Sequence, residues 1–272
     1  MIKIEHSVFA LPFALLGMIW AVGWPGARVF TLIVIAMVTC RSSAMAFNRI
    51  VDRSLDAANP RTSMRALPAG LLQPRHANLF FYGSCALFFI AAWALNPLAF
   101  ALSPVALGVT LLYSLTKRFT PLCHLILGLS LGIAPAAAWV AATGALDWRI
   151  VPLSAAVMCW TAGFDILYSL QDEEFDREHR LRSLPETLGK PKALLVSRAL
   201  HAATVVLLGV AGWAVGAGML YFLGALLAAF VLVYEQSLVK PDDLSRVNLA
   251  FFTLNGYVSI GVFAFALADR VV

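Results

Sequence analysis

The chain has 272 residues, of which 61% are hydrophobic and only 13% are charged. A soluble globular domain usually carries about 25% charged residues, so this composition excludes an ordinary soluble protein and indicates several membrane spans. The formal net charge of +5 would also suit a nucleic-acid partner. The apolar excess favours membrane topology as the reason for the basic charge, and we expect a lipid bilayer and no nucleic acid as partner.

Glycine, proline and clusters of charged residues divide the chain into nine apolar runs. Most approach the ~20 residues that a helical span needs, and they lack the alternation of barrel strands. Lipid offers no water to satisfy an open backbone, so helices are expected. We predict one membrane-embedded domain over residues 1–272, an all-α integral membrane bundle of about nine transmembrane helices. The expected spans are 7–24, 29–50, 75–95, 98–116, 121–142, 150–171, 192–213, 217–236 and 248–268.

Basic residues are distributed unevenly between the two sides of such a bundle. Sixteen Lys and Arg residues lie at the N-terminus and around the loops after the second, fourth, sixth and eighth spans. The other side has only Arg28, Arg149 and Arg270, and Arg41 lies within the second span. The positive-inside rule then predicts a multi-pass protein of the cell (inner) membrane, with the N-terminus and the sixteen basic residues in the cytoplasm.

The second expected span ends in a polar pattern, NRIVDRSLD. Asn48, Asp52 and Asp56 are four residues apart, so on a helix they fall within an arc of about 80°. Arg49 lies about 100° from Asn48 on the same helix, and we expect its side chain to face away from the acids.

The sixth expected span ends in a second acidic pattern, DILYSLQDEEFD. Asp165, Tyr168, Asp172 and Asp176 share one helical face within a similar arc. Like charges stacked one turn apart repel each other, so stability alone does not explain either acidic stripe.

Two carboxylate stripes at the same membrane face predict a positive ligand between them. Ligands that offer only oxygen favour Mg²⁺, which usually shares its shell with waters and substrate phosphates. Basic residues beside the stripes would help to hold a diphosphate. These are Arg65 in RALPAG, Lys117 and Arg118 in YSLTKR, and Arg182 in RLRSLP. The alternatives are that the acids only form ion pairs with loop arginines, and that the basic residues only set topology or contact lipid headgroups.

Other polar residues have two open interpretations each. Glu235 and Asn255 lie in apolar runs and are either functional or partners in helix packing. His6 either hydrogen-bonds an acceptor hydroxyl or lies solvated beside Lys3 and Glu5. The cysteines are expected to be small buried hydrophobic residues, with neither a disulfide nor a zinc site, because none forms a C-x-x-C pair: Cys40, Cys85, Cys123 and Cys159.

The two acidic patterns together resemble the UbiA superfamily of intramembrane prenyltransferases. The first family motif, N-D-x-x-D-x-x-x-D, is similar to NRIVDRSLD, and the second, D-x-x-Y-x-x-x-D with a further Asp, is similar to DILYSLQDEEFD. The RALPAG and YSLTKRF segments also look like family segments, and nine spans is the family's number. Arg49 departs from the pattern, because the family often has Asp there. The opening residues 1–17 and the segment 233–256 look most like the menaquinone-linked branch, whose members are often labelled 4-hydroxybenzoate polyprenyltransferases.

The resemblance implies a helical bundle around one central cavity. It implies transfer of a polyprenyl chain from its diphosphate to a small aromatic acceptor, of dihydroxynaphthoate or 4-hydroxybenzoate type, in quinone biosynthesis with Mg²⁺ as cofactor. The implied metal ligands are Asn48, Asp52, Asp56, Asp172 and Asp176. The implied substrate-binding residues are Asn48, Arg65, Tyr113, Lys117, Arg118, Asp165 and Arg182.

Tyr113 and Tyr168 are candidates to stabilise the allylic cation, with ordinary aromatic packing as the alternative. The runner-up function is an ion-coupled transporter that uses the intramembrane Asp residues. A transporter favours charges near the membrane midplane, whereas these acids lie at one face.

Overall fold

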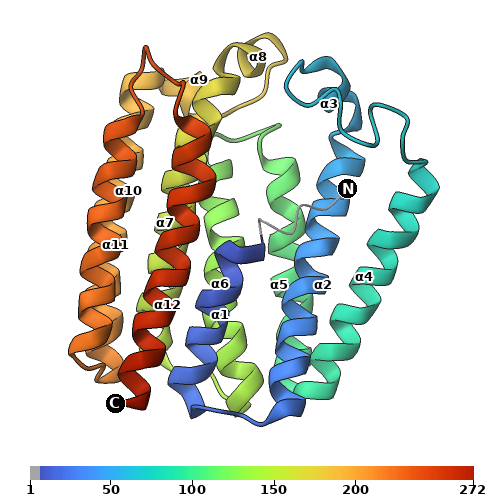
Figure 1. Cartoon of the computed structure of the whole chain (residues 1–272). Helices are drawn as coiled ribbons and strands as arrows, with labels where there is room; N and C mark the ends of the chain where they lie inside the picture. Colours follow the sequence, from blue (N-terminus) through green and yellow to red (C-terminus); the bar gives the residue numbers. More distant parts are fainter. Residues whose placement is uncertain (1–6) are drawn as a thin grey trace.

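The computed structural model describes residues 7–272, and Figure 1 shows that these residues form a bundle of long, roughly parallel helices. The long helices are α1 (Ser7–Val22), α2 (Ala27–Val51), α4 (Pro74–Leu95), α5 (Pro97–Thr116), α6 (Cys123–Thr143), α7 (Val151–Ser169), α10 (Lys190–Val215), α11 (Met219–Leu238) and α12 (Asn255–Val271). The short helices are α3 (Arg53–Ala58), α8 (Glu173–Glu178) and α9 (Leu184–Leu188), with 3₁₀ turns η2 (Trp148–Ile150) and η3 (Leu170–Asp172) and a π-helix η4 (Leu249–Leu254). The all-helical prediction is confirmed.

Eight of the long helices in the described part of the chain have the length and apolar composition to cross a membrane. The chain is therefore a multi-pass membrane protein. The exception is α1, whose 16 described residues extend about 24 Å at 1.5 Å per residue. Within residues 7–272, nine helices occupy the nine predicted runs, but by this measure the first falls short of the ~30 Å hydrocarbon core.

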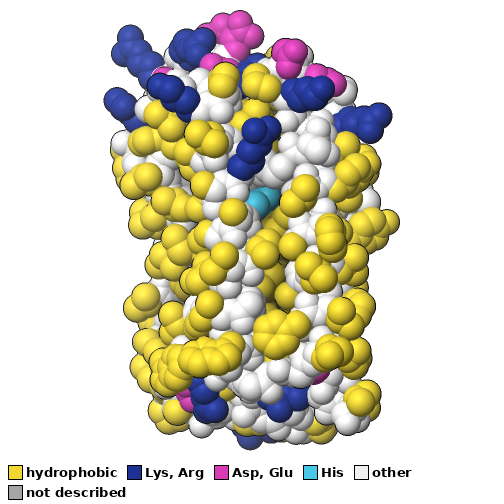
Figure 2. Space-filling model, turned by 90° about the vertical axis from the view of Figure 1, so that its left-hand side faces the viewer, with side chains coloured by type: hydrophobic (Ala, Val, Ile, Leu, Met, Phe, Trp, Pro, Cys, Tyr) yellow, Lys and Arg dark blue, Asp and Glu magenta, His cyan; other side chains and the backbone are white. Residues whose placement is uncertain are grey.

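Successive long helices run in opposite directions, so the connections alternate between the two ends of the bundle (Figure 1). The short helices α3, α8 and α9 all lie at the same end, and the C-terminus lies at the other. Charged side chains gather at both ends, whereas the waist between them is hydrophobic (Figure 2). The loops predicted to share one side do so.

Close helix contacts hold the two acidic patterns in place. Helix α7 packs against α6 and α10, while α2 packs against α4 and α5. Gly128 and Gly132 on α6 face the backbone of α7, where an added Cβ would meet the carbonyl oxygens of Met158 and Ser154 at 2.3 and 2.7 Å. Small residues allow helices in lipid to approach this closely. The close packing of α6 against α7 therefore fixes the position of the second acidic pattern, which begins on α7.

Both acidic patterns cross a break in their helix. Helix α2 ends at Val51, Asp52 has φ −94° and ψ 9°, and α3 follows. Helix α7 ends at Ser169 and is followed by η3 and α8. The continuous helical face that we expected through each pattern is therefore interrupted, and the last acids lie on short helices at the end of the bundle.

Candidate active site

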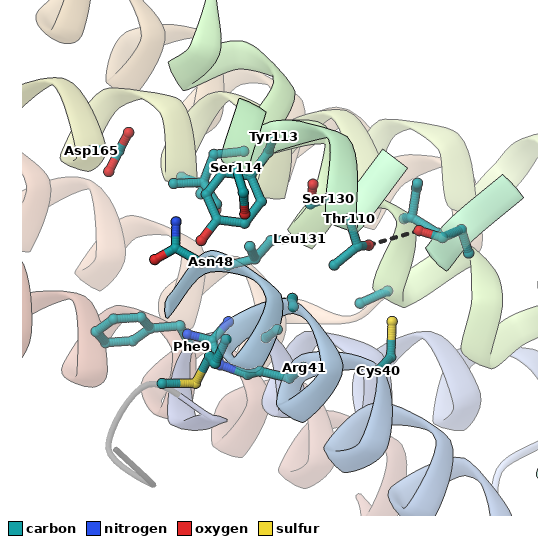
Figure 3. A pocket seen from close by; sticks show the side chains of 18 of the residues that line it. Phe9, Cys40, Arg41, Asn48, Thr110, Tyr113, Ser114, Ser130, Leu131 and Asp165 are labelled. Atoms are coloured by element: carbon teal, nitrogen blue, oxygen red, sulfur yellow. Dashed lines mark hydrogen bonds between the residues drawn. The ribbon is translucent and has the colours of Figure 1, made fainter. Parts of the chain in front are cut away.

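A cavity of about 580 Å³ lies among α2, α4, α5, α6 and α7. Its lining extends from the acidic patterns to Leu95 and Leu146 near the opposite end of the bundle. Figure 3 shows Asn48 and Arg41 from α2 and Tyr113 from α5 among the residues that line it. We call the end of the cavity beside the two acidic patterns the mouth and the rest of the cavity the interior. The cavity thus combines a charged mouth with a long, largely apolar interior.

Asp52 lies where α2 ends, within the first acidic pattern. Nδ2 of Asn48 donates to its Oδ2 (2.8 Å), and Nη2 of Arg118 donates to its Oδ1 (2.8 Å). Burial raises the pKa of Asp52 above its usual value, and the Arg118 guanidinium offsets part of that rise. The structure therefore brings together Asn48, Asp52 and Arg118, as the sequence predicts.

Asp56 is buried on α3 and faces two arginines. Nη1 of Arg65 lies 2.7 Å from its Oδ1, and Nη1 of Arg49 lies 3.9 Å from its Oδ2. Arg49 also donates to Oδ1 of Asn48 (3.2 Å) and lines the cavity. The expectation that Arg49 faces away from the acids is therefore wrong, because its long side chain reaches back across the helix surface to the acidic face.

Asp172 receives the most extensive set of contacts. Arg61 binds it in a bidentate manner, with Nε 3.1 Å from Oδ1 and Nη2 2.5 Å from Oδ2. Nη1 of Arg61 also donates to the hydroxyl of Tyr168 (2.9 Å), and Nδ2 of Asn59 donates to Asp172 Oδ1 (3.3 Å). Sequence reasoning assigned no site role to Arg61 or Asn59. The sequence signal for both residues was their position in NPRTS, the segment that directly follows the first acidic pattern.

Asp176 is fully buried and pairs with Lys117, whose Nζ lies 2.6 Å from its Oδ1. Burial alone would lower the pKa of Lys117, but the Asp176 carboxylate raises it above the usual value, so the ammonium stays charged. Arg182 has an exposed side chain that is not part of the cavity lining. Its backbone N–H donates to the Lys117 carbonyl (2.7 Å). The prediction placed the Arg182 side chain beside the acids, whereas the structure places its main chain there.

Asp165 lies deeper in the cavity than the other acids of the second pattern. Its Oδ2 lies 2.7 Å from Nδ1 of the buried His124 on α6. The Leu184 N–H donates to Nε2 of the same ring (3.3 Å), so Nε2 is an acceptor and Nδ1 carries the hydrogen that Asp165 accepts. His124 orients Asp165, a role that no spacing in the sequence indicated.

Arg41 lines the cavity seven residues before Asn48. Seven residues are close to two helical turns, so Arg41 lies on the same face of α2 about 10 Å deeper. Its Nε is buried and has no hydrogen-bond partner within residues 7–272, and none of the ion pairs in that range joins it to an acid. A guanidinium in an apolar interior attracts an anionic group strongly.

The remaining candidates divide into three groups. Glu235 and Asn255 are buried and hydrogen-bonded to each other, so they bridge helices. Lys3, Glu5 and His6 lie outside the described residues. All four cysteines are free thiols.

The donor set at the mouth fits Mg²⁺. It consists of carboxylates and one amide oxygen, which are the ligands that this ion prefers. Oδ2 of Asp56 is buried and accepts no hydrogen bond from the described residues, so it has an acceptor position left for a cation. Within residues 7–272, no three His, Cys, Asp or Glu side chains already converge as a metal-binding group. Each acid faces a basic side chain instead, as the ion-pair alternative predicts, and a metal would have to displace part of these contacts.

The sequence profile of the UbiA prenyltransferase family matches residues 10–257. The chain belongs to this family. The resemblance of the two acidic patterns is therefore confirmed, and the chain is a membrane-embedded prenyltransferase. An apo UbiA homolog from Aeropyrum pernix K1 is 37% identical, with 99% of each chain covered and a TM-score of 0.90.

Three further proteins extend the likeness. A UbiA homolog from Archaeoglobus fulgidus bound to DMAPP and Mg²⁺ has the same fold, with a TM-score of 0.76 at 22% identity and coverage of 98% of this chain and 96% of that one. The 4-hydroxybenzoate octaprenyltransferase of Vibrio atlanticus (strain LGP32) is 30% identical over 245 residues, which is 89% of this chain and 84% of the relative. The enzyme of the same name from Sodalis glossinidius is 29% identical over 239 residues, or 87% and 82% of the two chains.

Proposed function

We propose that this UbiA family member transfers a prenyl group from a prenyl diphosphate to a carboxylate-bearing aromatic acceptor, with Mg²⁺ as cofactor. The acceptor is of 4-hydroxybenzoate or dihydroxynaphthoate type, and the names of the bacterial relatives favour 4-hydroxybenzoate. The observation that carries the proposal is a charged mouth joined to an apolar cavity in which one arginine, Arg41, has no acidic partner within residues 7–272.

The acids at the mouth would hold the metal: Asp52, Asp56, Asp172 and Asp176, with the Asn48 side-chain oxygen. When bound, Mg²⁺ supplies positive charge that neutralises the diphosphate leaving group. The donor chemistry and the free oxygen of Asp56 support this assignment.

Four cations at the mouth would bind the diphosphate itself: Arg61, Arg65, Lys117 and Arg118. In the structure each forms an ion pair with one of the acids, so all four lie around the same space. Their charges stabilise the negative charge that develops on the diphosphate as the allylic C–O bond breaks. Arginine also suits this task because its planar fork binds phosphate oxygens in pairs.

The interior of the bundle would protect the allylic cation. Its walls are mostly hydrophobic, so they offer few hydrogen-bond partners that would hold water beside the cation. Tyr168 lies between the charged mouth and the apolar interior, with its hydroxyl hydrogen-bonded to Arg61. Its ring already contacts one cation, the Arg61 guanidinium at 5.0 Å from the ring centroid, and the same ring would stabilise positive charge on the allylic carbons. The apolar length of the cavity suits a prenyl chain.

Arg41 would hold the acceptor by its carboxylate. The two helical turns between Arg41 and Asn48, about 10 Å, leave room for one aromatic ring between the carboxylate site and the mouth. The acceptor ring carbon then forms a bond with the allylic carbon, and the hydrogen on that ring carbon leaves as a proton. Asp165, oriented by His124, is placed to accept this proton.

The mouth would face the cytoplasm of a bacterial inner membrane. The positive-inside rule supports this orientation, because the basic loops gather at the same end of the bundle as the mouth. A diphosphate then stays near water, while its prenyl chain lies within the bilayer.

The experiment is a membrane assay with radiolabelled geranyl diphosphate. 4-Hydroxybenzoate and 1,4-dihydroxy-2-naphthoate are offered separately, with Mg²⁺ or with EDTA. We expect a prenylated aromatic product that EDTA abolishes, with the preferred acceptor identified by the larger yield. Absence of product with both acceptors, from protein that elutes as a folded species in detergent, would overturn the proposal.

A further inference from the structure

A second polar cluster lies inside the bundle near the mouth, and the proposed chemistry makes no use of it. Asn255 at the start of α12 is fully buried, as is Glu235 on α11. Nδ2 of Asn255 donates to Oε1 of Glu235 (3.0 Å), and its Oδ1 accepts from Nε1 of Trp160 on α7 (2.5 Å). One amide thus joins three helices. Buried polar groups are costly unless hydrogen-bonded, so this cluster strongly constrains the side chain of Asn255.

The same amide also bonds to the backbone of the preceding π-helix. Nδ2 of Asn255 lies 3.0 Å from the Ala250 carbonyl and 3.2 Å from the Phe251 carbonyl. Both residues belong to η4 (Leu249–Leu254), the π-helical turn that precedes α12. Single π-helical turns are rare and are found frequently at functional sites. The side chain of Asn255 therefore satisfies carbonyl groups within this irregular turn.

Phe251 is the residue through which this turn reaches the cavity. Its ring lies 4.2 Å from the Tyr168 ring, measured between centroids, and packs edge-on against Phe164 at 5.2 Å. Phe251 and Tyr168 both line the cavity, and Arg61 lies over the Tyr168 ring at 5.0 Å from its centroid. The aromatic pair forms a wall directly beside the diphosphate-binding mouth.

We propose that Asn255, held by Glu235 and Trp160, is a positioning residue that fixes the η4 turn and so keeps Phe251 against Tyr168. This wall keeps water from the allylic cation until the acceptor ring attacks. The inference rests on the proposed prenyl transfer and adds a determinant of its outcome. Asn255 itself touches neither substrate.

Two reactions compete for the allylic cation, and the wall decides between them. In transfer, the acceptor ring carbon bonds to the allylic carbon and the ring loses a proton. In hydrolysis, a water oxygen bonds to the same carbon and releases a proton, which gives the free prenyl alcohol. If η4 relaxes toward a regular α-helix, Phe251 rotates relative to Tyr168, and water gains access at the mouth.

The test measures the ratio of prenyl alcohol to prenylated product with labelled geranyl diphosphate and 4-hydroxybenzoate. For Asn255→Ala we expect this ratio to rise about tenfold, because small misplacements of a wall residue have effects of this order. The KM for geranyl diphosphate should stay within about twofold, since the cations at the mouth are untouched. Phe251→Leu should give the same change, and Asn255→Ala combined with Phe251→Leu should be no worse than either alone.

Ser197→Ala is the matched control. Ser197 is also fully buried, donates to the Gly163 carbonyl (2.8 Å) and accepts from Gln236 (2.8 Å), and neither of these hydrogen bonds involves η4. We expect it to lower thermal stability while leaving the alcohol-to-product ratio at the wild-type value. A matching rise in Ser197→Ala would overturn the inference, because the effect would then report general loosening of the bundle.

The remaining outcomes are also decisive. If the wild-type protein forms product but Phe251→Leu keeps the wild-type ratio, the inference fails and the proposed function stands. An Asn255→Ala protein that does not fold leaves the decision to Phe251→Leu and Phe251→Tyr, of which only the first should raise the ratio. If the wild-type protein forms neither product nor alcohol, the proposed function itself fails.

Discussion

The mouth of the cavity and its interior differ in whether their charged side chains are paired. At the mouth, each of four carboxylates lies 2.5–2.8 Å from a basic side chain: Asp52, Asp56, Asp172 and Asp176. In the interior, Arg41 has no acidic partner among the described residues and a buried Nε without a hydrogen bond. The mouth is neutralised by its own residues, whereas the described residues leave the interior charge of Arg41 without an acidic partner.

This difference indicates how each region binds. The basic side chains at the mouth are partly exposed, whereas Asp56, Asp172 and Asp176 are buried, so these acids would exchange a basic partner only for another cation such as a metal ion. A guanidinium inside an apolar bundle costs several kcal/mol when unpaired, which an incoming carboxylate would recover in part. Under the proposed function, the mouth would bind the diphosphate and the interior would bind the acceptor.

The largest effect is expected at the mouth. Asp172→Ala removes a predicted metal ligand and the bidentate partner of Arg61, and transfer should fall by at least about 10³-fold. Asp52→Ala should have a similar effect. Activity is measured with labelled geranyl diphosphate, and elution from a sizing column in detergent verifies the fold. Activity within tenfold of wild type would contradict the role of the mouth.

The interior is tested by Arg41→Leu. Loss of a charged hydrogen bond of about 1.5–3 kcal/mol should raise the KM for 4-hydroxybenzoate about 10–100-fold. The KM for geranyl diphosphate should not change, because the mouth is intact. Cys40→Ala, at a neighbouring cavity-lining position, is the matched control and should affect neither KM. A change confined to the diphosphate KM would reverse the assignment of the two regions.

Arg49 lies at the boundary between the regions. It contacts both Asn48 and Asp56, so Arg49→Ala should lower kcat/KM for geranyl diphosphate about five- to tenfold by loosening both side chains. Steady-state kinetics with saturating acceptor measure this loss. An unchanged value would show that the contacts of Arg49 with Asn48 and Asp56 do not contribute to catalysis.

The smallest effect is expected for Arg182→Ala. Its side chain is exposed and outside the cavity, and its backbone makes the contact with Lys117. Activity should remain within about twofold of wild type, as for an ordinary surface substitution. Arg61→Ala, assayed in parallel, should lose at least tenfold, because Arg61 occupies the place that sequence reasoning gave to Arg182. Equal losses would show that Arg182 moves to the mouth during the reaction.

The spans and the two acidic patterns were predictable because both depend on local periodicity. Apolar runs of sufficient length specify helices in lipid, and the four-residue spacing of Asn48, Asp52 and Asp56 specifies a shared face. Despite the breaks at Asp52 and after Ser169, three of the acids line one cavity, so their grouping did not depend on a continuous helix: Asp52, Asp56 and Asp172.

The partners of the acids were less predictable because they lie on loops. Arg61 and Arg182 are both basic residues near an acidic pattern, and only the fold of residues 59–73 and 179–183 decides which one reaches the site. The π-helix before Asn255 has no periodic signature, and Arg41 was set aside because it lay inside a span. A lone arginine within an apolar run is itself the signal that an anionic ligand or partner is required.

The most direct test of the account is a structure of the protein with Mg²⁺, geranyl thiodiphosphate and 4-hydroxybenzoate. We predict the thiodiphosphate and metal among the four acids of the mouth, and the benzoate carboxylate at the guanidinium of Arg41. A benzoate bound through Arg61 or Lys117 at the mouth, with Arg41 still without an anionic partner, would contradict the division of the cavity into two regions.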